Sequence, residues 1–135
     1  MLSQKIKVVI DTNIIISSLW GGKPYDIIRK WAEGNIIMVV SREIMDEYME
    51  VFKRFNLSEN EMEELAVLLA NPRHTVLVNT KSKISLIKDD PKDNKFLECA
   101  VDGNADYIIS GDKHLLNCAD FKHCRILRAA NFLEL

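Results

Sequence analysis

The chain has 135 residues, 47% of them hydrophobic and 28% charged, with a net charge of −2 at pH 7, which is typical of one soluble globular domain. No apolar run is long enough to cross a membrane, and no general basic excess points to a nucleic acid as ligand. An amino terminus without a secretory pattern and three cysteines without a C-x-x-C pair predict a single cytoplasmic domain over residues 1–135, with no membrane partner.

Short apolar runs alternate with helical patterns along the chain, and capping residues indicate several helix ends. Ser41 is a typical N-cap, Ser58 and Glu61 form a capping box, and Pro91 and Gly103 bracket a later helix. In chain order the pattern predicts a strand at 5–10, a helix at 24–34, a strand at 36–40, helices at 41–55 and 58–71, a strand at 74–79, a polar connection at 80–90, a helix at 91–103, a strand at 105–110, a short helix at 112–117, a strand at 124–127 and a closing helix at 128–135.

The predicted strands are apolar throughout rather than alternating, which is typical of a parallel sheet covered on both faces. The fold class is therefore α/β, a three-layer sandwich with a central parallel sheet of about five strands flanked by helices. In open parallel sheets, functional residues gather at the carboxyl ends of the strands. Residues at those ends are the first candidates for a site.

Two predicted strands end at an aspartate, Asp11 after VVI and Asp112 after YIISG. Each also precedes a helical stretch, so each taken alone is better explained as an N-cap. Asp90 and Asp93 could likewise serve as the cap and the first-turn acid of their helix. However, Asp93 lies three, four and seven positions before the apolar Phe96, Leu97 and Ala100, so it is expected to face the core.

The helix predicted at 41–55 carries four acids, and periodicity distinguishes one of them. Glu47 lies nearest the apolar stripe, next to Val51, whereas Glu43, Asp46 and Glu50 point further towards solvent. An exposed helix acid remains an equal alternative for Glu47 on this evidence.

If Asp11, Glu47, Asp93 and Asp112 converge, they need a counter-charge. Two carboxylates about 4 Å apart repel by roughly 4 kcal/mol at an effective dielectric constant of ~20. Oxygen-only ligands suit Mg²⁺ or Mn²⁺, and carboxylate clusters with such ions commonly catalyse phosphodiester hydrolysis. The four acids therefore predict a magnesium or manganese site.

The segments VVIDTNIIIS, SREIMDEYMEV and DPKDNKFLECAVDGNADYIISGDKHLL, in this order, resemble the PIN domain family. Within it the chain looks most like small prokaryotic toxin components of toxin–antitoxin systems. The resemblance extends from Lys7 to the closing FLEL, and although D-T-N alone is weak, the joint pattern is specific.

The resemblance implies a metal-dependent endoribonuclease whose four acids match Asp11, Glu47, Asp93 and Asp112, both as catalytic residues and as metal ligands. Asn13 and Ser110 match polar positions that support the metal site, with Ser110 where Thr is common. Asp90 matches a further recurrent acid and shares a helix face with Asp93. The implied partners are RNA, a cognate antitoxin protein and a second copy in a homodimer; the substrate-binding residues are not indicated.

Alternative interpretations remain open at this point. The main one is a PIN-like module that binds nucleic acid without cleaving it, or that serves RNA processing. An aspartyl phosphotransferase is weakly supported, because such enzymes commonly carry D-x-D where this chain has D-T-N. A zinc site would use His114, Cys118, His123 and Cys124, but their spacing matches no recognised ligand pattern.

Two further features have ordinary explanations that are at least as good as functional ones. Trp20, Trp31 and Tyr48 could stack on bases, although at helical spacing core positions are favoured. A grouping of basic residues could contact phosphates, or could simply form a solvated face. It comprises Arg73, Lys81, Lys83, Lys88, Lys92 and Lys95.

Overall fold

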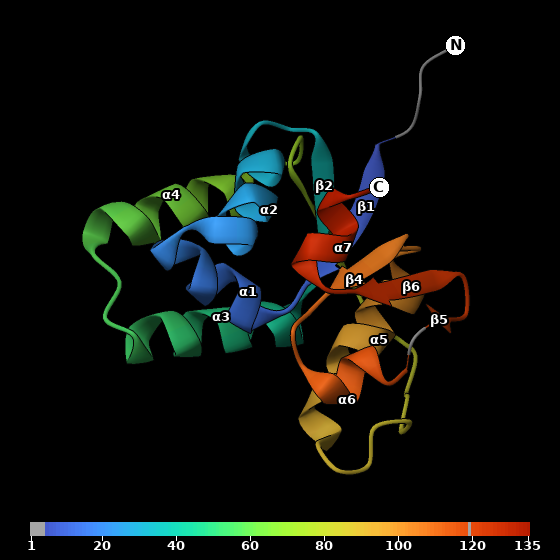
Figure 1. Cartoon of the computed structure of the whole chain (residues 1–135). Helices are drawn as coiled ribbons and strands as arrows, with labels where there is room; N and C mark the ends of the chain where they lie inside the picture. Colours follow the sequence, from blue (N-terminus) through green and yellow to red (C-terminus); the bar gives the residue numbers. More distant parts are fainter. Residues whose placement is uncertain (1–4, 119) are drawn as a thin grey trace.

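The structure is a computed structural model that describes residues 5–118 and 120–135. One or more helices lie between successive parallel strands of the chain (Figure 1). The strands are β1 (Ile6–Ile10), β2 (Ile36–Ser41), β3 (Thr75–Val78), β4 (Tyr107–Ile109), β5 (Asp120–Phe121) and β6 (Cys124–Leu127). The α-helices are α1 (Thr12–Ser17), α2 (Gly22–Ala32), α3 (Arg42–Arg54), α4 (Glu59–Ala70), α5 (Asn94–Asp102), α6 (Lys113–Leu116) and α7 (Ala129–Leu133), with 3₁₀ turns η1 (Ser18–Trp20) and η2 (Pro91–Asp93).

The strands form one sheet in the order β3-β2-β1-β4-β6-β5, and every neighbouring pair is parallel except β5 with β6. The predicted α/β class and parallel core are thus confirmed, with one addition. The sixth strand, β5, is two residues long and antiparallel. So short a strand has no hydrophobic periodicity, which is why the sequence pattern predicted about five strands.

Capping residues set the helix ends as expected. The Ser41 side chain accepts a hydrogen bond from the Ile44 amide, and Ser58 and Glu61 form a reciprocal capping box. The predicted helix at 91–103 is divided: residues 91–93 form a 3₁₀ turn, and the α-helix begins at Asn94. The helix predicted at 24–34 begins earlier, at Gly22, and has Pro24 in its first turn.

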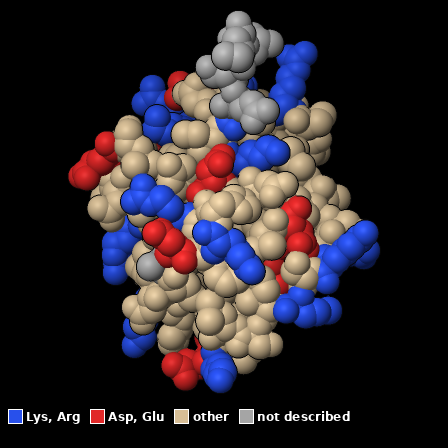
Figure 2. Space-filling model, turned by 90° about the vertical axis from the view of Figure 1, so that its right-hand side faces the viewer, with Lys and Arg blue, Asp and Glu red and all other residues tan. Residues whose placement is uncertain are grey.

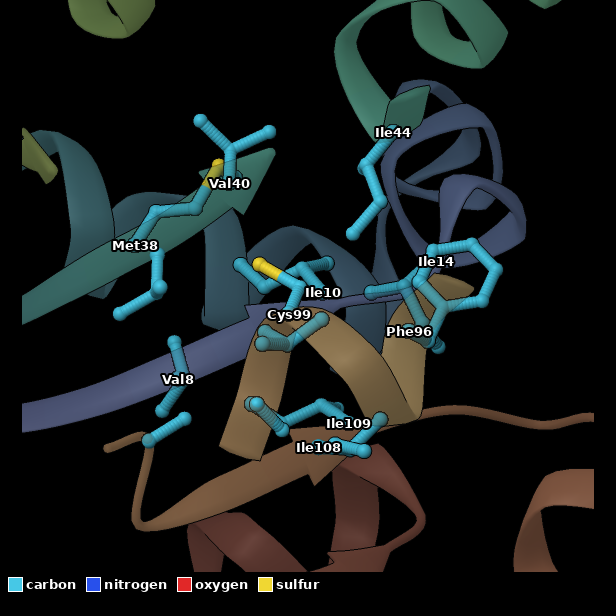
Figure 3. Packing of buried hydrophobic residues seen from close by; sticks show 14 of the residues in the cluster. Val8, Ile10, Ile14, Met38, Val40, Ile44, Phe96, Cys99, Ile108 and Ile109 are labelled. Atoms are coloured by element: carbon cyan, nitrogen blue, oxygen red, sulfur yellow. The ribbon is translucent and has the colours of Figure 1, made fainter. Parts of the chain in front are cut away.

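The core is formed by the strands and by the inward faces of the helices packed on them. Figure 3 shows Val8 and Ile10 of β1 near Cys99 of α5, with Ile108 and Ile109 of β4 close by. Trp31 and Tyr48 are fully buried, as core positions require, but Trp20 is 73% exposed. The core placement favoured for Trp20 is therefore wrong; its ring lies edge-on to Phe55, with 6.5 Å between centroids.

The order of the strands fixes where a site can form. From β1 the chain continues to β2 on one side of it, and only later to β4 on its other side. The carboxyl ends of β1 and β4 therefore flank the switch point of the sheet, where ligands bind in open α/β folds. Among the described residues, no helix has the length and apolar character needed to span a membrane.

Candidate functional site

Asp11 follows the central strand β1 and is 5% exposed. Its amide donates to the Ile109 carbonyl at 3.0 Å, which ties it to the end of β4. Its side chain caps α1 by accepting from the Asn13 amide at 3.4 Å. Burial is the main cause that raises the pKa of this carboxyl, opposed by its hydrogen bonds from Ser110 and Asn13. The capping interpretation and a place in the acid cluster thus both hold for Asp11.

Ser110 connects the ends of β1 and β4 through its buried hydroxyl. Oγ donates to Asp11 Oδ2 at 2.7 Å and accepts from the Asp112 amide at 2.9 Å. Asp112 in turn caps α6, because its Oδ1 accepts from the His114 amide at 2.7 Å. One hydroxyl thereby fixes the relative positions of two of the predicted acids.

Asp93 reaches the same cluster from the turn that precedes α5. Its Oδ2 is buried and, in the described part of the chain, has no hydrogen-bond partner. Burial, followed by the negative charges of Asp112, Asp90, Asp11 and Glu47, raises its pKa to about 7. The Asp93 side chain accepts no capping hydrogen bond from a helix. A role as the cap or first-turn acid of its helix therefore does not account for its position.

Glu47 comes from α3 and is already engaged by two neighbours. The Thr12 hydroxyl donates to Oε2, and the Lys95 ammonium lies 2.5 Å from Oε1. The Glu47 side chain is only 25% exposed, so it is not the exposed helix acid of the alternative explanation.

These side chains line one cleft of about 530 Å³. The lining includes all four predicted acids, Asp90, Asn13 and three basic residues. In full it comprises Asp11, Thr12, Asn13, Glu43, Asp46, Glu47, Glu50, Val51, Arg54, Asp90, Lys92, Asp93, Lys95 and Asp112. Ser110 lies beneath it, fully buried, with its hydroxyl on Asp11.

Within the described residues, one group of side chains could share a single ion: Asp90, Asp93, Asp112 and His114, whose ligand atoms all lie within 4.8 Å of one another. His114 Nδ1 is also 3.5 Å from Asp112 Oδ1. That group contains neither cysteine of the suggested zinc site, nor His123. The zinc interpretation therefore has no support among the described residues.

Sequence reasoning missed Thr12 and Lys95, which line the cleft, as partners of Glu47. It considered His114 only as a zinc ligand and not beside Asp90, Asp93 and Asp112. The motif D-K-H after β4 could have drawn attention to His114, because it places an imidazole two residues from an acid already selected. The contact between α5 and α3 has no signal in the sequence, since it depends on how two distant helices pack.

The donor set fits a hard divalent cation. The carboxylates of Asp90, Asp93 and Asp112 offer oxygen ligands close enough to share one ion, whereas Asp11 and Glu47 line the same cleft but lie outside that group. The buried Asp93 Oδ2, with no hydrogen-bond partner, is an atom that a cation would satisfy. The arrangement is thus compatible with binding of a metal ion.

Two sequence comparisons find similar proteins. The PIN domain family model matches residues 7–114. "Uncharacterized protein MJ1680" of Methanocaldococcus jannaschii is 33% identical over 123 residues, which cover 86% of this chain and 77% of that protein.

A solved structure has a similar fold. It is described as "Crystal structure of VapBC2 from Rickettsia felis bound to a DNA fragment from their promoter". The TM-score is 0.59 with 13% sequence identity, over 91% of this chain and 98% of the matched one. At that identity, the likeness concerns the fold alone.

Proposed function

Because the chain belongs to the PIN domain family, we propose that it is a metal-dependent endoribonuclease that hydrolyses phosphodiester bonds of RNA. The observation that carries the proposal is the carboxylate cluster at the carboxyl ends of β1 and β4. Asp11 is buried there, and Asp93 keeps a buried oxygen with no hydrogen-bond partner among the described residues. A structural role alone does not explain why so many acids converge at one point.

In this proposal Asp11, Glu47, Asp93 and Asp112 are both the catalytic residues and the ligands of Mg²⁺ or Mn²⁺. Asp90 and His114 adjoin Asp93 and Asp112 and could complete the ligand set. When bound, the ion would lower the pKa of a water molecule and offset the charge that develops on the phosphate.

Two residues hold the cluster in place. Ser110 orients the Asp11 carboxylate through its hydroxyl, and its Oγ also fixes the backbone of Asp112. Asn13 contributes its amide to the other oxygen of Asp11. These hydrogen bonds hold the two carboxylates in fixed positions, which reduces the cost of binding an ion.

RNA binding must rely on the cleft and its rim, because the chain as a whole is slightly acidic. On the face shown in Figure 2, Lys and Arg side chains are interspersed with Asp and Glu, and no broad field of one sign is formed. The cleft itself carries Arg54, Lys92 and Lys95 beside the acids. These cations are suited to contact backbone phosphates, which fits cleavage of a nucleic acid.

We further propose that the biological role is that of a toxin restrained by a cognate antitoxin, in the cytoplasm and as a homodimer. Two observations support this: the sequence resembles toxin components of the family, and the fold is similar to that of a chain in VapBC2. The three cysteines are free, as in a reducing compartment.

The proposal is tested by incubating a mixed single-stranded RNA pool with the protein in Mn²⁺, Mg²⁺ or EDTA, beside Asp93→Asn. We expect cleavage with metal, none with EDTA, and a loss of at least about 100-fold in the variant, as for removal of one electrostatic group at a reaction centre. Glu50→Gln is the matched control. This residue lines the same cleft, but its ion pair with Arg54 is largely exposed, so the substitution should leave activity nearly unchanged.

Two results would contradict the proposal. Cleavage that persists in EDTA, or full activity in Asp93→Asn, would show that the carboxylate cluster takes no part in the reaction. RNA binding without any metal-dependent cleavage would instead favour the non-catalytic binding module. That alternative has one observation in its favour, namely that Glu47 is already paired with Lys95.

A further inference from the structure

The contact between Lys95 and Glu47 differs from the other ion pairs that the described residues form between Lys or Arg and an acid. Nζ lies 2.5 Å from Oε1, and the two side chains are 19% and 25% exposed. In the pairs of Arg29 with Glu33, Arg54 with Glu50, and Arg125 with Asp120, every side chain is at least 51% exposed. Exposed pairs contribute little, whereas a shielded pair is screened less by salt.

The pair also has an unusual position. It joins the middle of α3 to the first turn of α5, two residues after Asp93. The Lys95 ammonium lies 5.9 Å from the centroid of the Phe96 ring, and Lys95 lines the cleft. Of the four acids proposed as ligands, Glu47 is the one that a Lys or Arg side chain neutralises directly in the described structure.

We infer that Lys95 is a positioning residue that takes the place of a cation at Glu47 in the metal-free protein and releases Glu47 when a divalent ion binds. The released ammonium then contacts a phosphate of the RNA substrate at the cleft wall. The inference rests on the proposed function, and it deepens that function by naming a residue that couples metal binding to substrate binding.

Electrostatics gives the direction of the exchange. A divalent ion at the carboxylate cluster attracts Glu47 with twice the charge of an ammonium group, and at the same time repels Lys95. The lysine side chain has a flexible four-carbon stem and three rotatable donors, so it can change partner without a change in the backbone. Lys92 and Arg54 line the same cleft, and Lys95 would join them as a third cation facing a phosphate.

The inference predicts that substitution of Lys95 raises the affinity for Mn²⁺ and lowers the affinity for RNA. Lys95→Met keeps an unbranched apolar stem and removes the charge. Without a competing ammonium, Glu47 is available, so Mn²⁺ should bind about tenfold more tightly, as expected for removing one unit charge about 6 Å from a divalent ion even in a water-like dielectric. The same variant should bind RNA less well and therefore show a raised KM.

The experiment measures Mn²⁺ affinity by isothermal titration calorimetry without RNA, and KM and kcat with RNA. Lys95→Gln repeats the test in case the Met variant folds poorly, and Lys95→Arg, which keeps the charge, should stay close to the wild type. Lys92→Met is the matched control: it is exposed, lines the same cleft and forms no ion pair in the described structure. It should raise KM but change Mn²⁺ affinity by less than about threefold.

The outcomes separate the inference from the function on which it rests. A purely structural lysine would lower Tm on substitution and leave Mn²⁺ affinity unchanged or weaker, and either result overturns the inference. If the wild type itself binds no Mn²⁺, the proposed function fails first and the inference with it. Tighter Mn²⁺ binding together with a raised KM in both Lys95→Met and Lys95→Gln supports it.

Discussion

The Ser110 hydroxyl donates a 2.7 Å hydrogen bond to Oδ2 of Asp11, although 99 residues separate them in sequence. The contact exists because β1 and β4 are parallel neighbours whose registered pairs end at Ile10 and Ile109. The next residue of each strand then lies at the same edge of the sheet. The acid cluster is thus a direct consequence of strand order.

Ser110→Ala removes a hydrogen bond to a buried carboxylate and should lower the free energy of unfolding by about 1–3 kcal/mol. Without that donor, the already raised pKa of Asp11 should rise further. Chemical denaturation at pH 7 in EDTA measures the stability loss. Ser110→Thr keeps the hydroxyl and is the control; if Ala and Thr behave alike, the hydroxyl has no role in stability.

The raised pKa of Asp93 gives a pH dependence with a definite sign. Below about pH 4 this carboxyl is protonated in both states, while between about 4 and 7 the unfolded chain ionises and the folded protein keeps its proton. The Asp93 contribution to stability therefore falls as pH rises through this window in EDTA. Asp93→Asn should abolish this decrease in stability with rising pH. Thermal unfolding between pH 4 and 8 in EDTA measures the decrease in the wild type and in the variant.

The exposed Asp89 provides the control for this pH dependence. Asp89→Asn should retain the pH dependence of the wild type, because it removes an exposed carboxyl and leaves the Asp93 carboxyl in place. Identical pH profiles for the wild type and Asp93→Asn would show that burial does not perturb the Asp93 carboxyl.

His114 should affect which ion is bound. Its imidazole lies with Asp90, Asp93 and Asp112 in the group that could share one ion, and nitrogen ligands favour Co²⁺ over Mg²⁺. His114→Gln should weaken Co²⁺ binding by about tenfold or more and leave Mg²⁺ binding nearly unchanged. Calorimetric titration with each ion provides the comparison. His123→Gln, at an exposed position, is the control, and equal losses for both ions would exclude His114 as a ligand.

Tyr48 holds the end of β1 next to the site through a buried hydrogen bond. Its hydroxyl is fully buried and donates to the Ile10 carbonyl at 2.5 Å, immediately before Asp11. Burial raises the pKa of this phenol well above 10, so it remains a donor at alkaline pH. Tyr48→Phe should cost about 1–2 kcal/mol of folding stability, because a buried carbonyl loses its donor. An unchanged denaturation midpoint would contradict this role.

Local signals in the sequence were sufficient for the main architecture. Apolar strands and capping residues act over a few positions, so β1, β6 and the Ser58 capping box were predictable. Periodicity also indicated that Asp93 and Glu47 turn inward. Contacts that depend on packing between distant elements were not predictable, and the pairing of Lys95 with Glu47 is the main example.

Gly103 illustrates a correct prediction with a different physical cause. It follows the end of α5 as predicted, but its φ is −94°, so no left-handed conformation requires glycine there. A Cβ at this position would lie 2.4 Å from Cγ1 of Val39 on β2. Close packing of α5 on the sheet, which a sequence pattern cannot reveal, is what requires the glycine.

The most direct test of the proposed metal centre is the anomalous difference map of a crystal soaked in Mn²⁺. We predict the strongest peak in the cleft, within coordination distance of the Asp93 and Asp112 carboxylates, and its disappearance in Asp93→Asn crystals. Mn²⁺ bound only elsewhere on the surface, or an unchanged peak in the variant, would contradict the assignment of the carboxylate cluster as a metal-dependent catalytic centre.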